Sequence, residues 1–169
     1  MATAPQPTHQ PRGRAWLETV FGTRSSDRSV DIALVVVRAA LAWIFIWYGA
    51  GKLFGWFSSP DRHQTELLFA NTAHIRPAAF FAVVSGVIEF GGGIAVALGL
   101  GARLVGLALF GEMVVATITV TGTHGPTSYQ LNLALGALTL AVALLGAGRF
   151  SVDARLERRL LATGAGSSP

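Results

Sequence analysis

Long apolar stretches separated by short polar ones dominate the pattern of this chain. Four such stretches occupy residues 30–50, 77–98, 103–121 and 129–146. A helix needs about 20 predominantly apolar residues to cross a hydrocarbon core of roughly 30 Å. The pattern therefore predicts an all-α membrane protein, a four-transmembrane-helix bundle built from these stretches.

The polar segments on either side divide the rest of the chain. Residues 1–29 are rich in Pro, Arg and Ser without an apolar run, which predicts a disordered basic tail and not a cleavable signal peptide. Residues 30–150 form the expected transmembrane domain. Residues 151–169 predict an amphipathic cytoplasmic helix with a flexible C-terminus, since apolar residues recur among arginines at Val152, Leu156 and Leu160. Residues 58–61, Ser-Ser-Pro-Asp, are typical of a helix start and predict a second short interfacial helix.

The arginines are unevenly distributed around the apolar stretches. Most of them lie in the two tails and next to the second connection, whereas the third connection has none. Because basic residues stay on the cytoplasmic side, both termini are expected in the cytoplasm, with the chain in the plasma membrane. The net charge of +4 then indicates contact with the lipid bilayer and its anionic headgroups, with no nucleic-acid partner.

Four charged residues lie inside otherwise apolar stretches of membrane length: Arg38, Lys52, Glu89 and Glu112. Counting about 1.5 Å per residue from the ends of the stretches places Arg38, Glu89 and Glu112 at one level, nearer the cytoplasmic side. A charge in hydrocarbon costs several kcal/mol, so such residues pair and often mark function. We expect Arg38 to bridge the two carboxylates, because a guanidinium has donors enough for both. The three are candidate catalytic residues for proton or quinone chemistry; alternatively the cluster only locks the helices in register.

A second group of polar residues is expected at the opposite, outer level. Lys52 follows an aromatic belt, and Trp56, His124, Gln130 and Asn132 should lie at the same height after the helices fold back. A cation with amide and imidazole groups beside aromatic rings could hold a quinone carbonyl or an oxyanion. These five residues are the candidate ligand-binding set, although Lys52 could equally extend to the interface with no ligand at all.

Several chemistries are excluded by composition. The chain has no cysteine, so disulfides, thiolate metal sites and dithiol chemistry are absent. All four histidines lie outside the apolar stretches, which excludes paired ligands for a buried haem. We find no Glu-x-x-His pair and no nucleotide-binding or serine-hydrolase motif. We therefore expect no metal site and no covalently bound cofactor, and an incomplete electron path in this chain alone.

Several motifs resemble those of the DoxX family of small bacterial membrane proteins. The matching residues are Arg38, Tyr48-Gly49, Lys52 to Phe57, Gly86 to Gly92, Gly99-Leu100 with Arg103, and Gly148 to Asp153. The stretch Gly-x-x-Lys-Leu-Phe-Gly-Trp-Phe is the most specific of them. The resemblance covers about residues 30–155. One departure is Gln130, where many relatives have an acidic residue after the tyrosine.

The resemblance implies a four-helix membrane bundle associated with redox systems. Relatives include a membrane subunit of thiosulfate:quinone oxidoreductase, and others assemble with enzymes of oxidative stress. The expected function is accordingly an accessory subunit of a redox complex that binds a partner oxidoreductase or other protein subunit and offers quinone a site. The alternatives are a transporter of a small solute or protons and a purely structural membrane anchor.

Overall fold

The computed structural model describes residues 28–57, 61–71, 74–124 and 129–165. These residues form helices and connecting turns without a β-strand. The helices are α2 (Arg28–Phe54), α3 (Arg62–Asn71), α4 (Ala78–Leu98), α5 (Ala102–His124), α6 (Gln130–Leu145) and α7 (Val152–Ala165). The expected N-terminal tail up to residue 27, the expected helix start at residues 58–60 and the last four residues lie outside the described residues.

Three of the helices are long and apolar enough to cross a membrane: α2, α4 and the part of α5 from Ala102 to Thr119. The fourth apolar stretch forms α6, which has 16 residues and is shorter. Helix α2 has 27 residues, or about 40 Å at 1.5 Å per residue, and so exceeds a hydrocarbon core of roughly 30 Å. It begins before residue 30 and ends after residue 50, so the first apolar stretch is longer at both ends than the sequence predicts.

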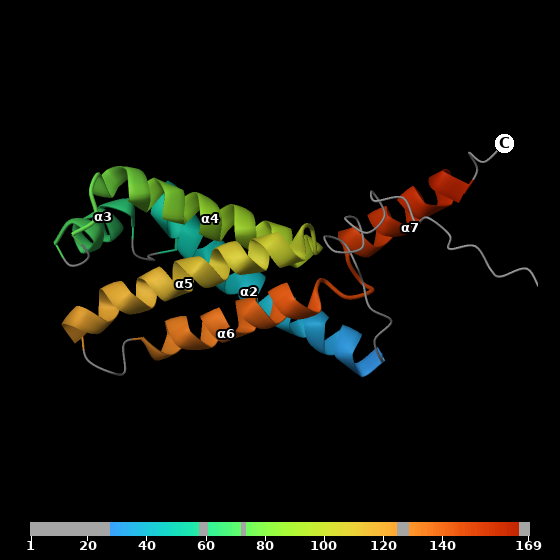
Figure 1. The fold of residues 1–169 in the computed structure, drawn as a ribbon. Coiled ribbons are helices and arrows are strands. Elements are labelled where there is room, and N and C mark those ends of the chain that lie inside the picture. The colour runs from blue at the N-terminus through green and yellow to red at the C-terminus, as the bar shows by residue number, and fades with distance from the viewer. Residues whose placement is uncertain (1–27, 58–60, 72–73, 125–128, 166–169) are drawn as a thin grey trace, which may run out of the picture.

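The bundle consists of two closely packed helix pairs (Figure 1). Helix α2 packs against α4, and α5 packs against α6; the two pairs then meet along α4 and α5 and, less extensively, along α2 and α6. The short helix α3 lies at one end of the bundle against α4, and α7 extends from the other end. The looser contact between the pairs leaves room for a cavity.

Glycines set the antiparallel alignment of α2 and α4. A Cβ on Gly93 would lie 2.9 Å from a side-chain carbon of Ile46, and a Cβ on Gly86 would lie 3.0 Å from the side chain of Leu53. Moving from Ile46 to Leu53 along α2 therefore corresponds to moving from Gly93 back to Gly86 along α4, which is the same number of residues in the opposite direction. Small residues let helix backbones approach closely in lipid, and this approach fixes which polar side chains of the two helices can meet.

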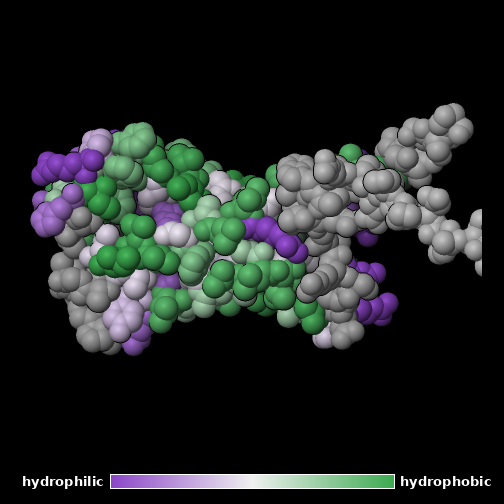
Figure 2. Space-filling view, viewed as in Figure 1, coloured by the Kyte–Doolittle hydropathy of each residue, from purple (hydrophilic) through white to green (hydrophobic). Residues whose placement is uncertain are grey.

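The remaining apolar side chains divide between a core and an outward surface. Leu41, Phe45, Val96, Leu109 and Val142 have at most 1% of their surface exposed and form the core between the helices. Many other large apolar residues of α2, α4, α5 and α6 face outward, and apolar atoms cover the middle of the bundle in Figure 2. An apolar surface of this extent is stable in contact with lipid, as is expected of a membrane protein.

Candidate functional site

Four polar side chains from three helices meet inside the bundle, and we call them the Lys52 cluster: Lys52, Ser85, Glu89 and Glu112. Lys52 Nζ lies 2.7 Å from Glu89 Oε1 and donates a hydrogen bond of 2.8 Å to Ser85 Oγ. Ser85 Oγ in turn donates a short hydrogen bond to Glu112 Oε1. One hydroxyl therefore connects the ammonium group to the second carboxyl group.

The helix alignment explains why these residues meet. Ser85 and Glu89 are one turn apart and lie on the same face of α4. Lys52 of α2 is level with this face, since a Cβ on Gly86 would lie 3.2 Å from the Lys52 Cβ. Glu112 reaches the same point from α5, so the cluster lies where the two helix pairs meet.

The cluster has more hydrogen-bond acceptors than donors. Glu89 Oε2 and Glu112 Oε2 are both buried and have no partner among the described residues. Lys52 has three N–H groups, of which two are used within the cluster. Buried polar groups in proteins are nearly always satisfied, so these two oxygens are the points in the cluster where a further hydrogen-bond donor would be stabilising.

A cavity of about 800 Å³ adjoins the cluster. Lys52, Ser85, Glu89 and Glu112 form part of its wall, and most of the remaining wall is apolar, with Phe45 of α2 and Ile88 of α4 as examples. Sites for small molecules typically have volumes of about 300–1,000 Å³, apolar walls and a few placed polar groups. The cavity has the size and character of such a site.

The cavity reaches the surface between α4 and α5. Phe81 of α4 and Val115 of α5 line it and are themselves 38% and 44% exposed. Figure 2 shows hydrophilic atoms in the furrow between these two helices, surrounded by apolar atoms. The opening thus lies on the apolar side of the bundle, where an apolar molecule dissolved in lipid could approach.

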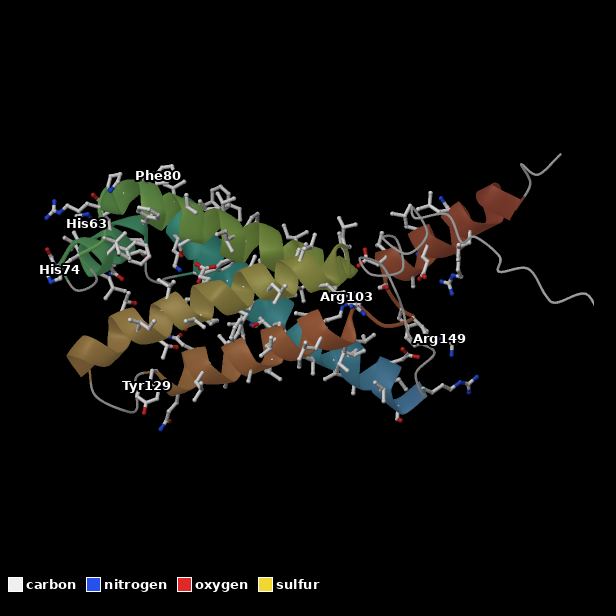
Figure 3. The ribbon with its side chains drawn as sticks, in the orientation of Figure 1. His63, His74, Phe80, Arg103, Tyr129 and Arg149 are labelled. Carbon is white, nitrogen blue, oxygen red and sulfur yellow. The ribbon has the colours of Figure 1, made fainter. Side chains whose placement is uncertain are left out.

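Helix α3 covers the cavity at one end of the bundle. Thr65, Leu68 and Phe69 of this helix contribute to the wall. Figure 3 shows that His63, His74 and Tyr129 all lie at this end, whereas Arg103 and Arg149 lie at the opposite end. The cavity therefore belongs to the end of the bundle that carries α3.

Arg38 is not part of the Lys52 cluster, and the prediction that it bridges Glu89 and Glu112 is wrong. Its guanidinium is buried and donates to four backbone carbonyls instead. The bonds run from Nε to Val96 O at 2.8 Å, from Nη2 to Ala97 O at 2.8 Å, and from Nη1 to Ala147 O at 2.8 Å and Phe150 O at 3.2 Å.

The physical reason is the position of Arg38 along α2. Arg38 is fourteen residues before Lys52, or about 21 Å along the helix. In the antiparallel pair this places it level with the C-terminal end of α4, where the last carbonyls of a helix have no partner within the helix. A cation at that point also compensates the negative end of the helix dipole. The guanidinium therefore donates to the last turn of α4 and to the connection between α6 and α7.

Further hydrogen bonds near Arg38 connect α7, and the segment that precedes it, to the bundle. We call Arg38, Gly99, Asp153 and their hydrogen-bond partners the Arg38 junction. Asp153 accepts hydrogen bonds from the backbone N–H groups of Gly101 at 2.8 Å and Ala102 at 3.1 Å, at the start of α5. Asp31 accepts one of 3.1 Å from the Arg149 backbone N–H. The junction thus joins α2, the end of α4, the start of α5 and the segment that leads from α6 into α7, far from the cavity.

Of the other expected ligand-binding residues, one lines the cavity, two do not, and one has a side chain that is not described. Asn132 lines the same cavity as Lys52, so these two expected residues do lie near one another. Trp56 is 54% exposed and packs against Phe54, and Gln130 is exposed; neither lines the cavity among the described residues. The side chain of His124 lies outside the described residues.

Sequence reasoning missed Ser85 and Tyr48. Ser85 forms the central link of the cluster, and Tyr48 lines the cavity one turn before Lys52. The spacing of Ser85 to Glu89 was a usable signal, because residues four apart share a helix face. For Tyr48 the sequence offers no such signal, because an aromatic residue near the end of an apolar stretch predicts only a position at the membrane interface.

The family motifs separate cleanly in space. Lys52 and Glu89 belong to the Lys52 cluster and line the cavity, and Gly86 packs against Lys52. Arg38, Gly99 and Asp153 belong to the junction. The model of the DoxX family matches residues 33–122, more than half of the 169-residue chain. No curated protein and no solved structure gives a match. On the strength of the family match, this membrane protein belongs to the DoxX family.

Proposed function

We propose that this protein is an integral membrane subunit of a redox complex and that its cavity binds a quinone-type ring. The observation that carries the proposal is the cavity of about 800 Å³ with mostly apolar walls and one charged polar corner, the Lys52 cluster. Apolar walls suit a ring with an isoprenoid-like tail, and the polar corner suits the oxygen atoms of its head group. The family is often linked to quinone oxidoreductases, which points the same way.

Each member of the cluster has a distinct part in this proposal. Lys52 donates a hydrogen bond to a ring oxygen with its remaining N–H group. Glu89 holds the lysine in place through their 2.7 Å contact. Glu112 and Ser85 hold or pass the protons that a ring oxygen gains or loses when its redox state changes. The opening between α4 and α5 gives a lipid-soluble molecule access from the bilayer.

The electrons come from a partner subunit in this proposal. The sequence has no cysteine for an iron–sulfur cluster and no histidine within its apolar stretches for a buried haem. The protein would therefore supply the membrane site for the ring, and a partner oxidoreductase would supply the electron path. Thiosulfate:quinone oxidoreductase-like and oxidative-stress complexes are the two settings that we consider.

We further propose that α6 is a fourth membrane span and that both termini are cytoplasmic. Helix α6 packs along α5 within the same layer (Figure 1), although its 16 residues are fewer than a span usually needs. Arg103 and Arg149 lie at the α7 end of the bundle. Basic residues favour the cytoplasmic side, so the α7 end would face the cytoplasm of a bacterial cell and the cavity would lie nearer the outer face.

The test is ring binding to the purified protein in lipid nanodiscs. Menadione and its reduced form, menadiol, serve as probes under anaerobic conditions, with calorimetry as the measurement. Lys52→Met alone would leave Glu89 buried and unpaired, so the double variant Lys52→Met with Glu89→Gln removes both charges together. We expect binding of at least one probe to the native protein and at least about tenfold weaker binding to the double variant.

The matched control carries the same types of change at the other end of the molecule, Arg155→Met with Glu157→Gln on α7. It should bind the probe as the native protein does. Failure of the native protein to bind either probe would refute the proposal. Co-purification from native membranes in mild detergent provides an independent test, since a redox subunit should elute with a partner oxidoreductase.

A second candidate function is proton transfer across the membrane. It is favoured by one observation, the continuous hydrogen-bonded path from Lys52 through Ser85 to Glu112. Liposomes loaded with a pH-sensitive dye distinguish it from the first. Proton flux that Glu112→Gln abolishes would favour transport, and the absence of both flux and ring binding would leave a structural anchor.

A further inference from the structure

We propose that the cavity binds the reduced, two-hydroxyl form of its ring ligand in preference to the oxidised, dicarbonyl form. This inference rests on the proposed function and concerns which redox state the site selects. It follows from the numbers of hydrogen-bond donors and acceptors that the Lys52 cluster leaves unused.

The unused groups of the cluster are mainly acceptors. Glu89 Oε2 and Glu112 Oε2 are buried without a partner among the described residues. Against these two oxygens stands one remaining N–H group of Lys52, because its contacts with Glu89 and Ser85 occupy the other two. Ser85 has already given its single hydrogen to Glu112.

The two redox states of a quinone-type ring differ in what they offer to such a site. The oxidised ring has carbonyl oxygens, which only accept hydrogen bonds. The reduced ring has two hydroxyl groups, each of which donates one and accepts another. While both carboxyl groups are ionised, only the reduced form can donate a hydrogen to their unpartnered oxygens. A buried acceptor left without a donor costs more free energy than an average hydrogen bond contributes.

The positions of the two carboxyl groups agree with this assignment. Glu89 comes from α4 and Glu112 from α5, the two helices that border the opening. Lys52 and Ser85 connect the carboxyl groups, so both belong to one corner of the cavity. A hydroxyl-bearing ring that enters between α4 and α5 therefore meets both carboxyl groups.

Selection of the reduced form has a direct consequence for the bound ring. A site that binds one of two interconverting states more tightly shifts the equilibrium towards that state. The ring in the cavity would consequently accept electrons and protons more readily than the same ring in the bilayer.

The experiment compares three probes with the same carbon skeleton: menadiol, menadione and the dimethyl ether of menadiol. The ether keeps the ring and both oxygen atoms but has no hydrogen to donate. In anaerobic nanodiscs we expect menadiol to bind at least about tenfold more tightly than either of the others, the factor expected for one hydrogen bond to a charged group.

Variants connect the preference to the carboxyl groups. Glu112→Gln replaces one unpartnered oxygen by an amide group and should reduce the preference for menadiol at least about threefold, a conservative fraction of one such hydrogen bond. Glu157→Gln makes the same change on α7 and should preserve the preference. The comparison of probes on the native protein needs no variant, so a misfolded Glu112→Gln would not prevent the test.

The outcomes separate this inference from the proposed function. Equal binding of the three probes, or tighter binding of menadione, would overturn the preference for the reduced form while ring binding itself stands. Tight menadiol binding that Glu112→Gln leaves unchanged would overturn the assignment to the carboxyl groups. Binding of none of the probes would overturn both the function and the inference.

Discussion

The replacement Arg38→Leu tests whether the buried charge in α2 stabilises the fold or serves the cavity. The guanidinium donates four hydrogen bonds of 2.8–3.2 Å to the carbonyls of Val96, Ala97, Ala147 and Phe150. Leucine fills much of the same volume but donates none of them. The replacement would therefore remove a charged donor from the last turn of α4 and from the connection between α6 and α7.

The magnitude follows from the burial of these bonds. The bonds to Val96 and Ala147 are buried, and the other two are partly buried. A hydrogen bond from a charged donor contributes about 1.5–3 kcal/mol, so the two buried bonds together contribute about 3–6 kcal/mol. Leucine also avoids the cost of burying a charge, which favours the lower end of that range. We expect a loss of about 3 kcal/mol, a large part of the 5–15 kcal/mol typical of folded domains.

The assay is reversible unfolding in mixed micelles, followed by the circular dichroism signal of the helices. Arg155→Leu on exposed α7 is the matched control and should change the free energy of unfolding by less than about 0.5 kcal/mol. Menadiol binding, measured on the folded fraction, should be unchanged in Arg38→Leu. An unaltered free energy of unfolding would refute the structural role, and normal stability with lost menadiol binding would instead place Arg38 in the ligand site.

The remaining predictions concern the junction and the helix contact. Gly99→Ala should lower the free energy of unfolding by at least about 2 kcal/mol in the same assay, because its φ of +67° disfavours a side chain and a Cβ would lie 2.5 Å from the guanidinium. Asp153→Ala removes the acceptor at the start of α5 and should cost about 1–2 kcal/mol, with Asp153→Asn recovering part of it. Gly86→Leu should displace Lys52 and weaken menadiol binding about tenfold in calorimetry, whereas Gly91→Ala, with open space around its Cβ, should bind normally.

The helices could be predicted from the sequence because hydropathy depends on residue type alone. The four expected stretches coincide with α2, α4, α5 and α6, and the arginine-rich C-terminal segment forms α7. The ends of the helices were less predictable. Helix α2 continues to Phe54, because a helix can extend beyond the hydrocarbon core and the thickness of the core therefore does not fix where it ends. An error of one turn at a helix end moves every level counted from it by about 5 Å.

The pairing of the charges could not be predicted for two physical reasons. The level of Lys52 depends on the alignment of α2 with α4, which glycine contacts determine and hydropathy does not show. The partners of Arg38 are main-chain oxygens, which every residue has and no sequence pattern reveals. Opposite charge suggested a pair with Glu89, but backbone carbonyls at a helix end were closer and equally in need of a donor.

The Arg38 junction also constrains how the protein is made. Arg38 enters the bilayer with the first helix, but its acceptor Ala147 lies 109 residues later in the chain. The ribosome must therefore synthesise the chain beyond Ala147 and Phe150 before Nη1 of Arg38 can donate to its acceptors. Until then two of the four hydrogen bonds of the Arg38 guanidinium have no acceptor, which lipid disfavours.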